Sequence, residues 1–151
     1  MDETPILICY DGSADAERAI ETAAALLGPR HAVVLDVAPP MTPAESVVAV
    51  TAVPVAPFAD LNLDDAVIGA TEGAARAKSA GFDAVARGDV DAPTWQAVVA
   101  VADEIDAAVI VLGSRGLTGA RERFEGSVSH DVAEHAGRPV LIVPPPHARH
   151  G

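Results

Sequence analysis

The chain is poor in the residues that build disulfide frameworks and aromatic cores. Of its 151 residues, one is cysteine and only 3% are aromatic. A single cysteine, Cys9, cannot form an internal disulfide, which favours a reduced, intracellular setting. With so few aromatic rings the core must consist of alanine, valine, leucine and isoleucine, and apolar residues make up 50% of the chain. Such a core suits a parallel sheet covered by alanine-rich helices.

Long apolar runs and a basic surface are also missing. The most apolar stretch, residues 46–58, is interrupted by Pro54 and Pro57 and is too short to span a bilayer, so we predict a loop there. No signal peptide precedes the first predicted strand, and we expect a cytoplasmic protein without membrane contact. The formal net charge of −12 repels phosphate backbones, so nucleic acid is not an expected partner.

Short apolar runs alternate with amphipathic helical patterns along the whole chain. The first helical pattern has Ser13 as its predicted N-cap and is stopped by Gly28 and Pro29. Alternating strands and helices imply a parallel sheet with right-handed crossovers, and we predict one domain over residues 1–151 with three α/β/α layers. The predicted strands are 5–9, 31–37, 82–87, 108–112 and 139–143, and the predicted helices are 14–27, 64–80, 93–105 and 127–136.

A glycine-rich segment follows the fourth predicted strand. Gly113, Gly116, Gly126 and Ser127 are spaced as G-x2-G-x9-G-S. Glycines let the backbone approach a ligand without a Cβ in the way. Gly126 and Ser127 open a helix, whose first N–H groups have no internal partner and favour an anion. The pattern predicts a phosphate-binding site.

This spacing resembles the nucleotide-binding branch of the universal stress protein family. The resemblance extends to ILICYDGSADAERAI, HAVVLDV and GRPVLIVPP, which together frame residues 5–145. It implies an adenine nucleotide alpha hydrolase-like (Rossmann-like) fold with five parallel strands in the order 3-2-1-4-5. The switch point then lies between strands one and four, where open α/β sheets bind ligands. Asp11 and the Gly113 turn should converge there.

The resemblance further implies a site for ATP, carried with Mg²⁺ or Mn²⁺ and without a protein-held metal. The base would lie against backbone groups at Val37, with Cys9 adjoining it, and Asp11 would approach the ribose or the metal. Residues 113–116 would surround the ribose and first phosphates, and residues 126–128 the distal phosphates. The predicted site residues are Cys9, Asp11, Val37, Leu112, Gly113, Ser114, Arg115, Gly116, Gly126, Ser127 and Val128.

Other roles remain open for several of these residues. Asp11 can stabilise the turn after a strand, Ser127 can be only an N-cap, and Arg115 can be exposed without a ligand. Cys9 is more typical of a buried packing residue. Glu125 departs from the family pattern and places a negative charge beside the predicted phosphate site.

Residues elsewhere in the chain do not add a further site. The five histidines lack partners at metal-ligand spacing, so we predict no protein metal site. We expect Trp95 to pack against the sheet rather than stack on a base. Residues 140–145 form an apolar edge strand, from which we predict a homodimer.

No catalytic pattern accompanies the predicted site. A Walker sequence and a kinase catalytic loop are both missing, so we predict binding without efficient turnover, although the resemblance allows slow ATP hydrolysis or autophosphorylation. A response-regulator receiver is disfavoured because Asp11 stands alone after the first strand. The leading hypothesis is an ATP-dependent stress-response sensor or switch that recruits an unidentified protein partner. The alternative is a nucleotide-independent stress protein that acts only through its homodimer and partner surfaces.

Overall fold

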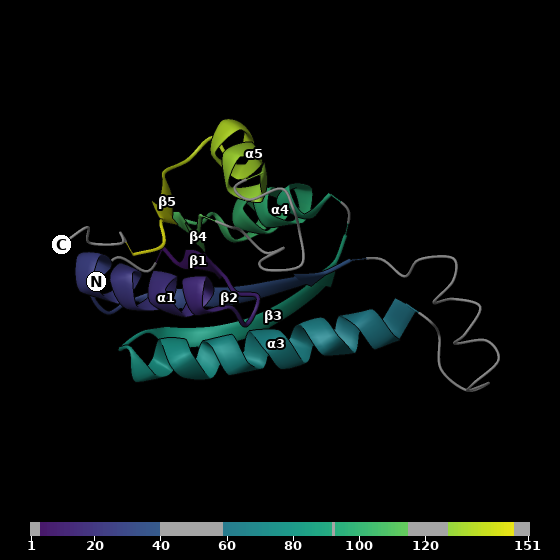
Figure 1. Cartoon of the computed structure of the whole chain (residues 1–151), viewed down its shortest axis with the longest axis horizontal. Coiled ribbons are helices and arrows are strands. Elements are labelled where there is room, and N and C mark those ends of the chain that lie inside the picture. The colour runs from purple at the N-terminus through teal and green to yellow at the C-terminus, as the bar shows by residue number, and fades with distance from the viewer. Residues whose placement is uncertain (1–3, 40–58, 92, 115–126, 147–151) are drawn as a thin grey trace.

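The computed structural model describes residues 4–39, 59–91, 93–114 and 127–146. Within these ranges, strands and helices alternate along the chain (Figure 1). The strands are β1 (Ile6–Cys9), β2 (His31–Ala38), β3 (Asp83–Val90), β4 (Ile110–Gly113) and β5 (Val140–Val143). The helices are α1 (Ala14–Leu27), α3 (Ala59–Ser79), α4 (Thr94–Ile105) and α5 (Ser127–His135).

All five strands are parallel and form one sheet in the order β3-β2-β1-β4-β5. This confirms the predicted fold class and strand order. From β1 the chain adds β2 and then β3 toward one edge of the sheet. It then returns to the other side of β1 and adds β4 and β5 toward the opposite edge. The direction in which strands are added therefore reverses between β1 and β4. β1 is the central strand, and each of its residues is at most 2% exposed.

The helices cover the two faces of the sheet in pairs (Figure 1). Ile6, Ile8 and Tyr10 pack on one face with apolar side chains of α1 and α3. Leu7 and Cys9 point to the other face and pack with α4 and α5. The alternation of side chains along β1 therefore divides the core into two layers.

Helix α1 begins and ends where the sequence predicted. The Ser13 side chain accepts a hydrogen bond from the Ala16 N–H at 3.1 Å, as an N-cap does. At the other end Gly28 adopts φ 71°, and its N–H donates to the Ala24 carbonyl. Left-handed backbone of this kind favours glycine and terminates the helix.

Helix α3 approaches the sheet closely through two glycines one turn apart. A Cβ built on Gly73 would lie 2.6 Å from Tyr10 Cγ and 2.8 Å from Val34 Cγ1. A Cβ on Gly69 would collide with the Asp36 carboxylate of β2. These glycines therefore let the helix lie directly over Tyr10 and β2.

Two predicted boundaries differ from the structure by more than two residues. Helix α3 begins at Ala59 instead of residue 64, so residues 59–62 are helical and not part of a loop. There the Asn62 side chain donates to the Pro39 carbonyl at 2.8 Å. Strand β3 continues to Val90 because its ladder with β2 runs unbroken from His31–Asp83 to Ala38–Val90. The predicted loop over 46–58 lies outside the described residues.

Within the part of the chain that the structure describes, every helix is too short or too polar to cross a membrane.

Candidate functional site

The sheet has a notch above the carboxyl end of β1. Strand β1 stops at Cys9, and its ladders end at the Cys9–Leu35 pair on one side and the Ile8–Val111 pair on the other. Its neighbours continue further, β2 to Ala38 and β4 to Gly113. The notch therefore has β2 and β4 as walls and the turn after β1 as its floor, and it lies at the switch point of the sheet.

Backbone groups from both walls face the notch. Successive residues of a strand direct their N–H and C=O groups to alternate sides. The Leu35 carbonyl accepts from the Tyr10 N–H at 2.8 Å, so Val37, two residues on, also directs its groups toward the β1 side. On β4, the Ser114 N–H donates to the Val143 carbonyl of β5, so Gly113 directs its groups the opposite way, toward β1.

Asp11 organises the floor of the notch. Its half-buried side chain follows β1, and Oδ1 accepts the Ser13 N–H at 2.9 Å. Between these residues Gly12 has φ 81°. Asp11 thus has the turn-stabilising role left open by the sequence, and it stands at the end of β1 where a ligand role was also predicted.

Gly113 has a packing reason as well as a predicted ligand role. A Cβ at this position would lie 3.2 Å from Asp15 Cβ and 3.3 Å from the Asp15 carbonyl oxygen. Helix α1 therefore begins directly against the end of β4. Alanine at position 113 would press on this helix, so such a variant tests packing and ligand binding together.

Ser114 is held by hydrogen bonds from two other elements. Its N–H donates to the Val143 carbonyl of β5 at 2.9 Å. Its carbonyl accepts the Ser129 hydroxyl of α5 at 2.9 Å. The Ser129 contact ties the start of α5 to the end of β4 and brings α5 to the edge of the notch. The sequence does not single out Ser129, whose only signal is a hydroxyl residue two positions after Ser127.

Four predicted site residues direct their side chains into the core. Cys9, Val37, Leu112 and Val128 are at most 7% exposed and pack on the α4 and α5 face. Burial, with the charges of Asp11 and Asp36, raises the pKa of Cys9 to about 12, so its thiol stays protonated at neutral pH. These residues can contribute only backbone groups to a polar ligand.

Most of the remaining predicted site residues lie outside the part of the chain that the structure describes. Arg115, Gly116 and Gly126 fall outside the described residues, as does Glu125. Ser127 is the first residue of α5, which agrees with the predicted start of this helix.

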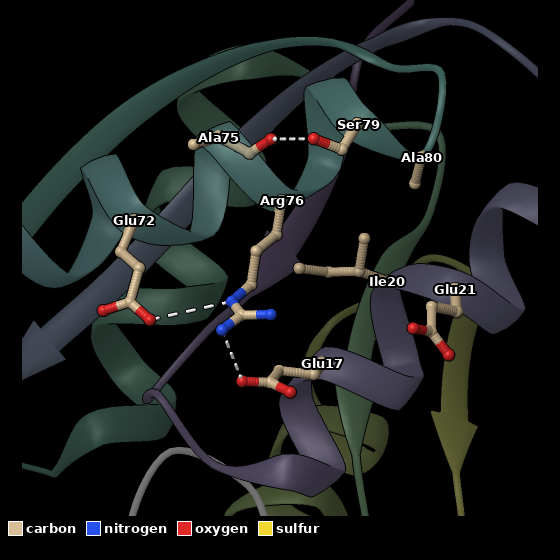
Figure 2. Close-up of a pocket in the computed structure, with 8 residues that line it drawn as sticks. All are labelled: Glu17, Ile20, Glu21, Glu72, Ala75, Arg76, Ser79 and Ala80. Carbon is tan, nitrogen blue, oxygen red and sulfur yellow. Dashed lines mark hydrogen bonds and ion pairs between the residues drawn. The ribbon is translucent and has the colours of Figure 1, made fainter.

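A groove lies between α1 and α3 on the described surface (Figure 2). It has a volume of about 560 Å³. The Arg76 guanidinium lies between two carboxylates: its Nη2 is 3.0 Å from Glu17 Oε1, and its Nε is 3.6 Å from Glu72 Oε1. Glu72 also accepts the Tyr10 hydroxyl at 3.0 Å. These contacts join α1, α3 and the end of β1, and we interpret the groove as a structural junction.

Trp95 and the three histidines among the described residues, His31, His130 and His135, behave as packing and surface residues. Trp95 packs against the α4 and α5 core, as expected, and stacks on His135 with ring centroids 4.3 Å apart. His31 pairs with Asp83, and His130 lies 3.7 Å from Glu134. Among the described residues, His, Cys, Asp and Glu side chains form no group of three that could hold a metal ion.

The fold is an open, doubly wound α/β sheet whose topological switch point lies between β1 and β4. The family model described as the universal stress protein family matches residues 4–144. The chain therefore belongs to the universal stress protein family. Among curated protein sequences, none matches this chain closely enough to indicate a relationship.

Solved structures of similar fold cover nearly the whole chain. The hypothetical protein MJ0577 is 22% identical with a TM-score of 0.69, and 98% of this chain and 100% of that chain are covered. A universal stress protein in complex with cAMP is 28% identical with a TM-score of 0.62, with 93% and 96% covered. The universal stress protein from Archaeoglobus fulgidus in complex with dAMP is 22% identical with a TM-score of 0.61, with 95% and 99% covered.

Proposed function

We propose that this protein binds ATP together with Mg²⁺ in the notch above β1 and acts as a nucleotide-dependent sensor in a stress response. The observation that carries the proposal is the pair of strand ends, at Val37 and Gly113, whose backbone groups face the notch from opposite walls. A 28% identical universal stress protein has been solved in complex with cAMP, which is also an adenine nucleotide.

The base belongs at the β2 wall. An N–H and a C=O directed to the same side form a donor and acceptor pair, and Val37 presents both beyond the last pair of β2 with β1. The adenine edge offers an acceptor and a donor at matching spacing, whereas guanine presents the reverse order at its equivalent edge. Fixed backbone groups at Val37 therefore favour adenine.

The ribose and phosphates belong on the β4 side. Gly113 packs against Asp15 in the first turn of α1, and the N-terminus of α5 adjoins Ser114 through Ser129. Helix N-termini favour anions because their first N–H groups lack internal partners. Asp11 would contact the ribose or the metal. The net charge of −12 opposes a nucleotide polyanion, which gives the divalent cation an electrostatic role.

ATP with Mg²⁺ is expected to stabilise the fold. At about 100 times its dissociation constant, a ligand that binds only the native state adds roughly 2.7 kcal/mol. For a domain of this size that is roughly 5–10 °C in melting temperature. Differential scanning fluorimetry with ATP, GTP and inorganic triphosphate measures the shift, and GTP should give less because the Val37 backbone groups are fixed.

Asp11→Asn provides a matched variant for this measurement. The amide oxygen can still accept the Ser13 N–H, so the turn is kept while the charge that faces the ribose or metal is removed. We expect this variant to melt like the wild type without ligand and to show a smaller shift with ATP and Mg²⁺. Equal shifts from all three phosphate compounds would defeat base recognition, and no shift at all would favour the nucleotide-independent alternative.

We also propose a homodimer through β5. This strand is at the sheet edge, where unpaired backbone groups favour pairing with a second chain. Val143 is 5% exposed and packs with α1, and Leu141 lies against the same core. A lysine at either position would disrupt the subunit itself. Ile142, 36% exposed, is the apolar residue of β5 that an interface can use.

Ile142→Lys is therefore expected to convert the dimer to monomers without unfolding them, because a charged side chain disfavours strand pairing at an edge. Sedimentation at micromolar concentration measures the mass, and circular dichroism checks the fold. Leu26→Lys, at an exposed apolar position on α1, is the matched control and should sediment like the wild type. A wild-type protein that sediments as a monomer would rule the dimer out.

A further inference from the structure

Ser129 is a buried polar residue near the start of helix α5. It lies in the first turn of α5 and is 5% exposed. Serine is mostly found on protein surfaces, and burying a hydroxyl is unfavourable unless it is hydrogen-bonded. In a first helical turn, a serine side chain commonly bonds backbone groups of its own helix. The Ser129 hydroxyl reaches a different element and donates to the Ser114 carbonyl at 2.9 Å.

The partner of Ser129 is itself fixed from the opposite side. The Ser114 N–H donates to the Val143 carbonyl at 2.9 Å, so β5 holds one side of this peptide and α5 the other. Ser114 directly follows Gly113, whose backbone faces the notch. The two hydrogen bonds thus set the orientation of the backbone where it leaves β4, and they set its separation from the first turn of α5.

We infer that Ser129 is a positioning residue for the phosphate groups of the nucleotide, an inference that rests on the proposed function. It holds the end of β4 and the N-terminus of α5 at a fixed spacing, so that backbone donors from the two elements face the same polyanion. Ser129 does not touch the ligand. Donors held in place before binding give higher affinity because less freedom is lost when the ligand arrives.

Replacing Ser129 by alanine tests this role. Alanine is the best helix former, so α5 is kept while the bond to Ser114 is lost. We expect the ATP dissociation constant to rise about five- to tenfold, the change that corresponds to one net hydrogen bond. Adenosine, which has no phosphates, should bind Ser129→Ala and wild type alike. Displacement of a fluorescent ATP analogue measures both ligands.

Val132→Ala separates positioning from stability. Val132 is fully buried one turn further along α5 and makes no hydrogen bond through its side chain. This variant should lower the melting temperature at least as much as Ser129→Ala while leaving ATP affinity within about twofold of wild type, since its effect is on packing. Ser129→Cys, which is nearly isosteric and only a weak donor, should lose ATP affinity as Ser129→Ala does.

Three results would overturn the inference: wild-type ATP affinity in Ser129→Ala, an equal loss of ATP affinity in Val132→Ala, or an equal loss for adenosine and ATP. In each case the wild type still binds ATP and the proposed function stands. A wild-type protein that binds no adenine nucleotide removes the proposed function and, with it, the phosphate role of Ser129.

Discussion

Replacing Gly73 by alanine is expected to destabilise the protein by about 2 kcal/mol, although alanine is the better helix former by about 1 kcal/mol. The added Cβ would lie 2.6 Å from Tyr10 Cγ, 2.7 Å from Tyr10 Cδ1 and 2.8 Å from Val34 Cγ1. Both neighbours are fully buried, Val34 in β2 and Tyr10 directly after β1, so they cannot move aside freely. Helix α3 must shift, and urea denaturation measures the loss in unfolding free energy.

Ala75→Gly is the control for helix propensity. Ala75 is exposed on the same helix, so this change should cost only about 1 kcal/mol through propensity. Shortening Val34 to alanine in the Gly73→Ala background removes one of the close contacts, and the double variant should lose less than the sum of the single changes. A Gly73→Ala protein as stable as the wild type would mean that the glycine is not needed for the approach of α3.

Raising the pH from 9 to 12 is expected to unfold the protein through two adjacent residues. Burial first, then the charges of Asp11 and Asp36, raises the Cys9 pKa from 9.0 to about 12. Burial, followed by the hydrogen bond to Glu72, raises the Tyr10 pKa from 10.0 to about 12. In both cases the folded chain keeps a proton that the unfolded chain releases. The stability linked to each group is therefore complete below the unfolded pKa and is lost as the pH approaches 12.

The size of this effect is comparable with the whole stability of a small domain. The pKa difference of Cys9 corresponds to about 4 kcal/mol, against 5–15 kcal/mol for typical native proteins. The raised pKa of Tyr10 acts in the same direction, and solvent near its hydroxyl makes its contribution smaller. The chain contains one cysteine and one tyrosine, so the ultraviolet absorbance of the thiolate and that of the tyrosinate each report a single residue. Both signals should rise together with the loss of circular dichroism.

Two variants assign the effect to its sources. Cys9→Ala and Tyr10→Phe should each be less sensitive to pH between 9 and 12 than the wild type, because each lacks one of the raised pKa values. Tyrosinate absorbance with a midpoint near 10.0 in a protein that is still folded would show that Tyr10 is accessible to solvent and would contradict the burial described above.

The order of elements was predictable because it depends on local signals. Ser13 caps α1, Gly28 ends it, and the alternation of strand and helix determines the fold class. The boundaries that failed depend on distant partners. β3 extends to Val90 because β2 supplies a ladder for it, and the pattern near Gly88 contains no sign of that pairing.

The candidate site was predictable in the same limited sense. The motif placed Asp11 and Gly113 at neighbouring strand ends, since the carboxyl ends of parallel strands meet at one edge of a sheet. It could not show that Gly113 packs on Asp15, or that Ser129 bonds the Ser114 carbonyl, because both contacts join residues far apart in the sequence. The position of Val37 beyond the last pair of β2 with β1 likewise follows from where the β1 ladder stops.

The sheet order also determines when the sheet can be completed during synthesis of the chain. β1, β2 and β3 are neighbours in the sheet and follow one another in sequence, so they can pair as soon as they are made. The second neighbour of β1 is β4, which is translated much later. Until β4 is made, one edge of the apolar central strand has backbone N–H and C=O groups without a partner. Such an edge favours aggregation. A chain arrested before β4 would have the β2 wall and the Asp11 turn but no opposing wall, so ligand capture must await the last third of this sequence.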